Sequence, residues 1–64
     1  MTKDEAHREV LRQWRQLPVQ DRRTFEQAVS FAAVVTPAIE FETMGSRQRM
    51  IAAWLQRDLL EAAA

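Results

Sequence analysis

The sequence contains no cysteine, a single histidine (His7) and a single glycine (Gly45) among its 64 residues. Without cysteine no disulfide can form, and His7 has only Asp4 at a suitable spacing, which falls short of the three or four protein ligands of a stable metal site. A domain of this size buries only about 60% of the surface that its unfolded chain exposes. Small domains compensate with disulfides, a metal or a second subunit, so association with another chain is the device that remains.

The residues that catalysis requires are also scarce. The chain has no tyrosine, and Lys3 is its one lysine. Ser30 and Ser46 have no histidine base at a recognisable spacing, and the acidic pair Glu40 and Glu42 has no apolar pocket beside it. One glycine is too few for a phosphate-binding loop. We therefore predict that the chain is not an enzyme and binds no cofactor, metal or small-molecule substrate.

The charge balance argues against a general attraction to nucleic acid or membranes, because nine basic residues offset nine acidic ones. Apolar runs such as Phe31 to Val35 are far shorter than the roughly 20 residues that cross a bilayer. No apolar segment follows the charged N-terminal residues, and this predicts that there is no secretory signal. We therefore expect a cytoplasmic location. Apolar residues make up 47% of the chain, and this is typical of a folded domain.

Apolar residues at helical spacing predict a first helix from near Thr2 to Gln16 or Leu17. Thr2 and Glu5 match a capping box, in which each side chain bonds to the backbone amide of the other residue. The side chains on the face to be buried are Ala6, Val10, Trp14 and Leu17. The pattern is that of an ordinary amphipathic helix.

A second helix is predicted to begin at Pro18, which suits the first turn because its missing amide would have no partner there. It should end at Thr36-Pro37, since a residue before proline is displaced from the helical region, and Thr36 is expected to cap the turn that follows. Its inner stripe is Phe25, Ala28, Val29, Ala32 and Val35. The second half is apolar nearly all round, which indicates a helix that is enclosed or that offers a face to another chain.

Residues 37–44 alternate apolar and polar side chains and are predicted to form a short helix or an extended connector. Gly45 ends this stretch, and Ser46 is a good N-cap for a final helix from Arg47 to about Ala62. The prediction is therefore an all-α fold: one domain over residues 1–64, built as a small bundle of three main helices with a short fourth helical or extended connector.

Asp58 falls inside the apolar face that the final helix is expected to bury. That face consists of Ile51, Trp54, Leu55, Leu59 and Ala62. A buried carboxylate is costly unless it is paired, so we predict an ion pair between Asp58 and Arg22 on the second helix.

The two apolar helices carry more apolar surface than one three-helix core can bury. The surplus side chains are Phe31, Val34, Met50, Ala53 and Leu60. Such faces favour a regulatory or inhibitory protein that binds a second copy of itself, a larger protein, or both. Small regulators carried by phages and plasmids are of comparable size, which is an analogy of size alone. In the opposing interpretation, Ile39 and Phe41 of the connector cover this surface.

DNA binding is the alternative function. Arg47, Gln48 and Arg49 could form the first turn of the recognition helix in a helix-turn-helix, with support from a basic band on the first helix. That band consists of Arg8, Arg12 and Arg15. Against this interpretation, Phe41 occupies a position that needs a small side chain. The spacings from Asp4 to Arg8 and from Glu9 to Arg12 also favour ion pairs within the first helix.

Overall fold

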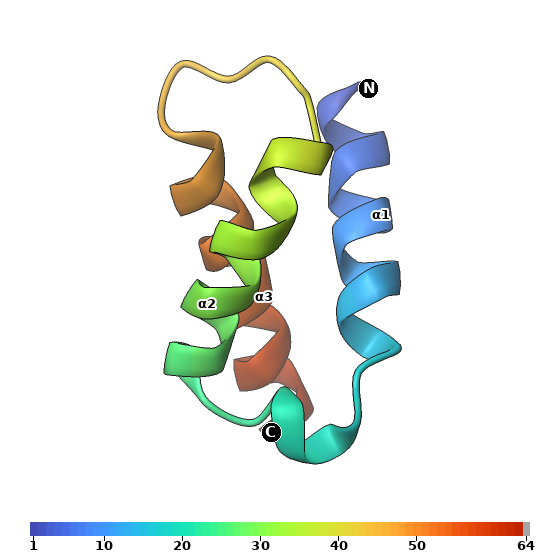
Figure 1. Ribbon diagram of the computed structural model, residues 1–64, viewed down its shortest axis with the longest axis vertical. Helices are drawn as coiled ribbons and strands as arrows, with labels where there is room; N and C mark the ends of the chain where they lie inside the picture. The colour runs from blue at the N-terminus through green and yellow to red at the C-terminus, as the bar shows by residue number, and fades with distance from the viewer. Residues whose placement is uncertain (64) are drawn as a thin grey trace.

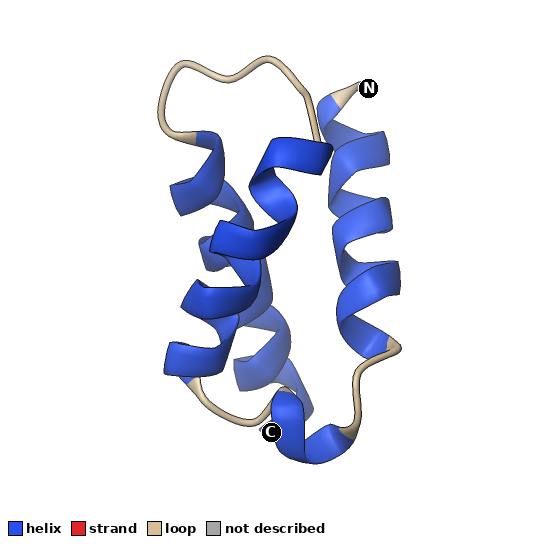
Figure 2. Ribbon diagram, in the orientation of Figure 1, coloured by secondary structure: helices blue, strands red, loops and turns tan. Residues whose placement is uncertain are grey.

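The structure is a computed structural model that describes residues 1–63. It contains three α-helices, α1 (Lys3–Arg15), α2 (Phe25–Val35) and α3 (Arg47–Ala63), and two single-turn 3-10 helices, η1 (Val19–Asp21) and η2 (Thr36–Ala38). Figure 1 shows α2 running antiparallel to both α1 and α3. Within the described residues there is no strand (Figure 2). The predicted all-α bundle of three main helices is confirmed.

The start of α1 is confirmed in detail. The Thr2 hydroxyl accepts a hydrogen bond from the Glu5 amide at 3.2 Å, and the Thr2 amide donates to the Glu5 carboxylate at 2.9 Å. This reciprocal pair satisfies two of the amides that have no partner inside the helix. α1 ends at Arg15, one residue before the nearer of the two predicted ends.

The predicted start of α2 is wrong. Pro18 precedes η1, and α2 begins only at Phe25, with Thr24 as its N-cap. The Thr24 hydroxyl accepts from the Gln27 amide at 3.1 Å, while the Gln27 side-chain oxygen accepts from the amides of Thr24 at 3.1 Å and Arg23 at 2.7 Å. This capping box satisfies more free amides than a proline start can, since no side-chain cap is present at Pro18.

α2 ends at Val35, at the predicted Thr36-Pro37 boundary, but the predicted reason and the predicted cap at Thr36 are wrong. Thr36 keeps helical dihedral angles, with φ −52° and ψ −44°, although Pro37 follows it. Its hydroxyl donates to the Ala32 carbonyl at 2.6 Å and caps nothing beyond. α2 therefore leads directly into η2, where Pro37 occupies an initial position that requires no amide.

Residues 39–46 have no regular structure, and their side chains alternate in burial. Ile39 and Phe41 are buried, at 2% and 7% exposure. Glu40, Glu42 and Met44 face solvent. Of the two predicted forms, a short helix or an extended connector, the chain combines a single turn, η2, with an extended segment that contributes two side chains to the core.

The start of α3 is confirmed, because the Ser46 hydroxyl accepts a hydrogen bond from the Arg49 amide at 3.2 Å. Arg47, in the first turn, reaches back to the connector: its guanidinium donates to the Ile39 carbonyl at 2.8 Å and lies 3.5 Å from the Thr36 carbonyl. This contact fixes the connector across the top of the bundle (Figure 1).

The core consists of ten buried apolar side chains drawn from all three α-helices and the connector. They are Ala6, Val10, Trp14, Ala28, Ala32, Val35, Ile39, Phe41, Ile51 and Leu55. α2 packs most extensively against α3 and contributes mainly small side chains, since two of its three buried residues are alanine. Trp14 is fully buried and its ring lies 5.3 Å from that of Phe31, so large side chains connect α1 to α2.

Leu55 and Leu60 form a matched pair for testing this core, because Leu55 is fully buried and Leu60 is 61% exposed on the same helix. We expect Leu55→Ala to lower the free energy of unfolding by about 2–5 kcal/mol, whereas Leu60→Ala should change it by less than about 0.5 kcal/mol. The milder Ile51→Val should cost about 0.5–1.5 kcal/mol. Urea denaturation followed by circular dichroism measures all three, and equal losses for the two leucines would contradict the assigned core.

Candidate protein-binding surface

The outward side of α2 is almost free of charge. Its exposed residues include Val29, Ser30, Ala33 and Val34, which we call the α2 outer surface. No charged residue occurs between Glu26 and Glu40. By contrast, every exposed residue of α1 is charged, namely Lys3, Asp4, Glu5, Arg8, Arg12 and Arg15. The two helices therefore present opposite kinds of surface to their surroundings.

Three of the larger apolar side chains of α2 lie outside the core, although Val35 is buried in it. Val34 is 74% exposed, Phe25 50% and Val29 46%, while Ala28 and Ala32 are fully buried. The predicted inner stripe was therefore partly wrong, because it included Phe25 and Val29. Alanines at the contact let the backbones of α2 and α3 approach closely. Because the alanine face of α2 is turned toward α3, the side chains of Phe25, Val29 and Val34 are directed to the flanks and the outside.

The α2 outer surface lies between two hollows. On one side, Leu17, Phe31 and Val34 line a hollow that also includes Glu26 and Ser30, and we call it the Leu17 hollow. On the other side, Val29 lines a groove with Ala52 and Ala53 of α3, which we call the α2–α3 groove. At about 100° per residue Val29 and Val34 are about 140° apart around the helix, which places them on opposite flanks.

The five side chains predicted to bind protein do not form one continuous patch. Val34 is 74% exposed and Leu60 61%, and Ala53 is also exposed. Phe31 and Met50 are half-buried: Phe31 packs on Trp14, and the Met50 sulfur accepts a hydrogen bond from the Thr43 hydroxyl at 3.7 Å. Phe31 and Val34 share the Leu17 hollow, whereas Ala53 belongs to the α2–α3 groove. The connector buries Ile39 and Phe41 but leaves Val34, Ala53 and Leu60 in solvent.

The arginines proposed for DNA binding are mostly engaged with the protein itself. The Arg47 guanidinium binds the Ile39 carbonyl, Arg12 pairs with Glu9 at 2.6 Å, and Arg15 pairs with Asp58 at 2.6 Å. The other three residues of that set, Arg8, Gln48 and Arg49, are exposed. They come from two helices, and Gln48 and Arg49 border the α2–α3 groove.

The geometry before α3 also departs from a helix-turn-helix. In that motif a turn of three or four residues joins two helices. Here residues 39–46 separate η2 from α3, and Phe41 lies in the extended connector. The helix that should precede Gly45 is therefore absent at this position.

The predicted ion pair between Asp58 and Arg22 is wrong. Asp58 accepts a hydrogen bond from the Arg15 guanidinium at 2.6 Å, and its side chain is only 15% exposed. The Arg22 guanidinium instead donates to the Leu17 carbonyl at 2.9 Å. Asp58 is paired as expected of a poorly exposed carboxylate, but its partner comes from the last turn of α1, which lies alongside α3.

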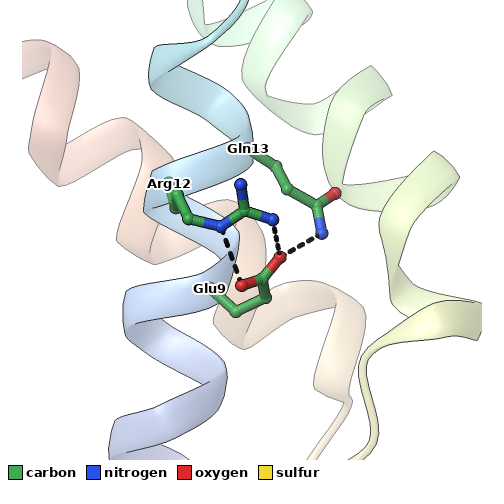
Figure 3. A network of polar contacts seen from close by, with 3 residues as sticks. All are labelled: Glu9, Arg12 and Gln13. Carbon is green, nitrogen blue, oxygen red and sulfur yellow. Dashed lines mark hydrogen bonds and ion pairs between the residues drawn. The ribbon is translucent and has the colours of Figure 1, made fainter.

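A polar network occupies the solvent side of α1 (Figure 3). The Glu9 carboxylate accepts from Arg12 at 2.9 and 2.6 Å and from the Gln13 amide group at 2.6 Å. The Arg12 and then the Gln13 hydrogen bonds lower the pKa of Glu9 to about 2. The predicted Glu9–Arg12 ion pair is confirmed. Asp4 and Arg8 form no ion pair in the described chain, so that prediction is wrong.

His7 is half-buried, and its ring lies 4.7 Å from the Trp54 ring, which itself stacks on Phe41 at 5.3 Å. In the part of the chain from residue 1 to 63, no three acidic or histidine side chains gather as metal ligands would. Across the same residues, none of the helices combines the length and apolar character that a bilayer crossing requires.

The fold is thus that of a small three-helix bundle with a charged outer face on α1 and an uncharged one on α2. Comparisons with protein-family models, curated proteins and solved structures found no match. The charged face of α1 and the uncharged face of α2 are therefore the features from which a function is inferred.

The revised ion pair can be tested by double-mutant cycles. We expect Arg15→Ala and Asp58→Ala to show a coupling free energy of roughly 0.5–1 kcal/mol in urea denaturation, because one partner is poorly exposed and the other is in solvent. The matched cycle of Arg22→Ala with Asp58→Ala should give a coupling near zero. A larger coupling for Arg22 than for Arg15 would restore the original prediction.

The Glu9 network predicts a specific response to acid. Because the folded-state pKa of Glu9, about 2, lies below the ordinary 4.5, its stabilising effect is present above about pH 4.5 and is lost as the pH falls toward 2. Glu9→Gln should therefore melt at a lower temperature than wild type at neutral pH and lose less stability on acidification. The control is Glu61→Gln. In the wild type the Glu61 carboxylate lies 3.9 Å from Arg57. An unchanged acid response in Glu9→Gln would refute this assignment.

Proposed function

We propose that this chain is a small, non-enzymatic cytoplasmic regulator or inhibitor that acts by binding another protein chain through the α2 outer surface. One observation carries the proposal: α2 buries Ala28 and Ala32 but exposes Val29 and Val34. Ala28 and Ala32 are fully buried while Val34 is 74% exposed.

The energetic argument concerns the apolar side chains left in water. Fully burying a valine or phenylalanine stabilises a structure by about 1.5–3 kcal/mol relative to leaving it exposed. Single exposed apolar residues are normal in soluble proteins. Here, however, exposed Val34 lies beside Ser30 and half-buried Phe31 on one flank of α2, and the only charged residue of the helix is Glu26. A partner that covers this helix would recover the free energy that the isolated chain forgoes.

The character of the surface favours protein over nucleic acid. Affinity for DNA depends chiefly on cations that contact phosphates. The α2 outer surface offers none, and the basic side chains of α1 include Arg12 and Arg15, which are already paired with carboxylates. An uncharged apolar helix is instead suited to another apolar protein surface.

The small size of the chain favours a regulatory or inhibitory role. A bundle of this size with no catalytic group can act by occupying part of a partner's surface and excluding other molecules from it. α2 is anchored in the bundle by its alanine face and the Thr24 cap, so its outer side chains are held in place before binding. Such preorganisation lowers the entropic cost of association.

Capture of partners from the native host tests the proposal when variants are compared. Tagged wild-type chain and the control Arg8→Asp, which changes the charged face of α1, should retain the same partner. Val34→Asp should retain at least tenfold less, because a carboxylate would be buried in the contact. Its helical circular-dichroism signal should be unchanged, since Val34 is 74% exposed. Equal capture by Val34→Asp and wild type would refute the proposal, as would selective loss with Arg8→Asp.

A further inference from the structure

We infer that the chain covering α2 is a second copy of this protein, packed antiparallel to the first about Ser30, with Val34 of each copy entering the Leu17 hollow of the other. This inference rests on the proposed function, because it names the partner of the same surface. It requires that the surface be complementary to itself, which the positions along α2 support.

The outward residues of α2 recur at spacings of three and four, as helix-pairing positions do. Glu26, Ser30, Ala33 and Val34 follow this pattern, as does Gln27, which is half-buried and bonded in the N-terminal cap. A two-fold axis at Ser30 places the two Ser30 side chains opposite each other, Gln27 opposite Ala33, and Glu26 opposite Val34 of the other copy. Small side chains thus occupy the centre of the contact, where two helices must approach most closely.

The same pairing aligns Val34 with a hollow. It brings Val34 of one copy level with Glu26 of the other, and Glu26 lines the Leu17 hollow, where Leu17, Phe31 and that copy's own Val34 are the apolar lining residues and Asp21, Thr24, Gln27 and Ser30 the other polar ones. Val34 is 74% exposed in the single chain, so it is free to enter. Because the arrangement is symmetric, both copies contribute one valine and one hollow, and two apolar side chains leave water at once.

The charges around α2 are compatible with self-association. The central contact positions Gln27, Ser30 and Ala33 are uncharged, and the carboxylates of Asp21 and Glu26 border the contact at the Leu17 hollow. Arg23 of one copy would lie at the carboxyl end of the partner's α2, where the helix carries partial negative charge. The whole chain has zero formal net charge at pH 7, so two copies do not repel each other at long range. The charged face of α1 is a poor candidate for the same role, because burying it would desolvate many ions.

The size of the contact predicts how tightly the copies associate. An 11-residue helix is about 16 Å long, so α2 and the adjoining hollow give a contact below the roughly 800 Å² per partner of a standard interface. That standard area would be about a sixth of the 4605 Å² accessible surface of the chain. We therefore expect a reversible dimer that dissociates in roughly the micromolar range.

Sedimentation equilibrium across about 1 µM to about 1 mM tests the dimer directly. The wild-type mass should rise from one chain to two over this range. Val34→Asp should dimerise at least tenfold more weakly. Leu60→Asp, which alters a similarly exposed side chain on α3, should dimerise like wild type because Leu60 is outside the contact.

Disulfide trapping tests the position of the two-fold axis, and the natural absence of cysteine makes it clean. Ser30→Cys should form a linked dimer under mild oxidation at least tenfold faster than Ala53→Cys, an exposed position on α3. Faster linkage at Ala53 would overturn the proposed pairing.

A chain that remains monomeric at every concentration would overturn the second copy as the occupant. If Val34-dependent capture of a different host protein persisted in that case, the proposed function would stand with another partner. If capture also became independent of Val34, both proposals would fail. The two failures are therefore distinguishable.

Discussion

The contact between the alanine face of α2 and α3 is the constraint on which the rest of the structure depends. Ala28 and Ala32 are fully buried, and Ala52 of α3 packs against the core. Short side chains let the two helices approach closely, so little space remains there for larger ones. The larger core side chains then come from the other elements, with Trp14 on α1 and Ile51 and Leu55 on α3. Val29, Val34 and Phe25 of α2 are consequently exposed, whereas Val35 is the one valine of the helix that enters the core.

The connector between α2 and α3 covers one end of the core with an extended segment instead of a fourth helix. Its alternating pattern places Ile39 and Phe41 in the core and the glutamates in solvent. Arg47 satisfies the carbonyl group of Ile39, at the start of this extended segment, with a hydrogen bond of 2.8 Å. An arginine at the start of α3 that resembles a DNA-reading residue is therefore explained as a structural contact.

Much of the fold follows from local sequence patterns, since the caps at Thr2 and Ser46 and the alternation of the connector each depend on nearby residues. The cap at Thr24 was equally local and could have been found, because Thr24 and Gln27 repeat the spacing of Thr2 and Glu5. Pro18, six residues earlier, also matches a common helix start. The sequence therefore contains two competing start patterns, and the capping box at Thr24 is the one that forms.

Local sequence patterns do not determine which face of α2 is buried, nor which residue pairs with Asp58. Periodicity shows which side chains of α2 share a face, but its second half is apolar nearly all round. Which face turned inward therefore depended on the shape of α3. The partner of Asp58 depended on how the end of α1 aligns with α3, a tertiary property that no spacing in the chain encodes. Val34 and Leu60 are exposed, as the surplus of apolar surface predicts, but Phe31 and Met50 are half-buried, and the separation of Val34 from Ala53 into two hollows follows only from the fold.

The central claim is that the α2 outer surface is an interface, and amide chemical shifts in a concentration series test it most directly. In ¹H–¹⁵N spectra recorded from dilute to concentrated samples, our account predicts shifts confined to α2 and to the segment around Leu17, with Arg8 and the rest of the α1 outer face unchanged. Shifts centred on α1 or the end of α3, or spectra independent of concentration, would contradict self-association through α2.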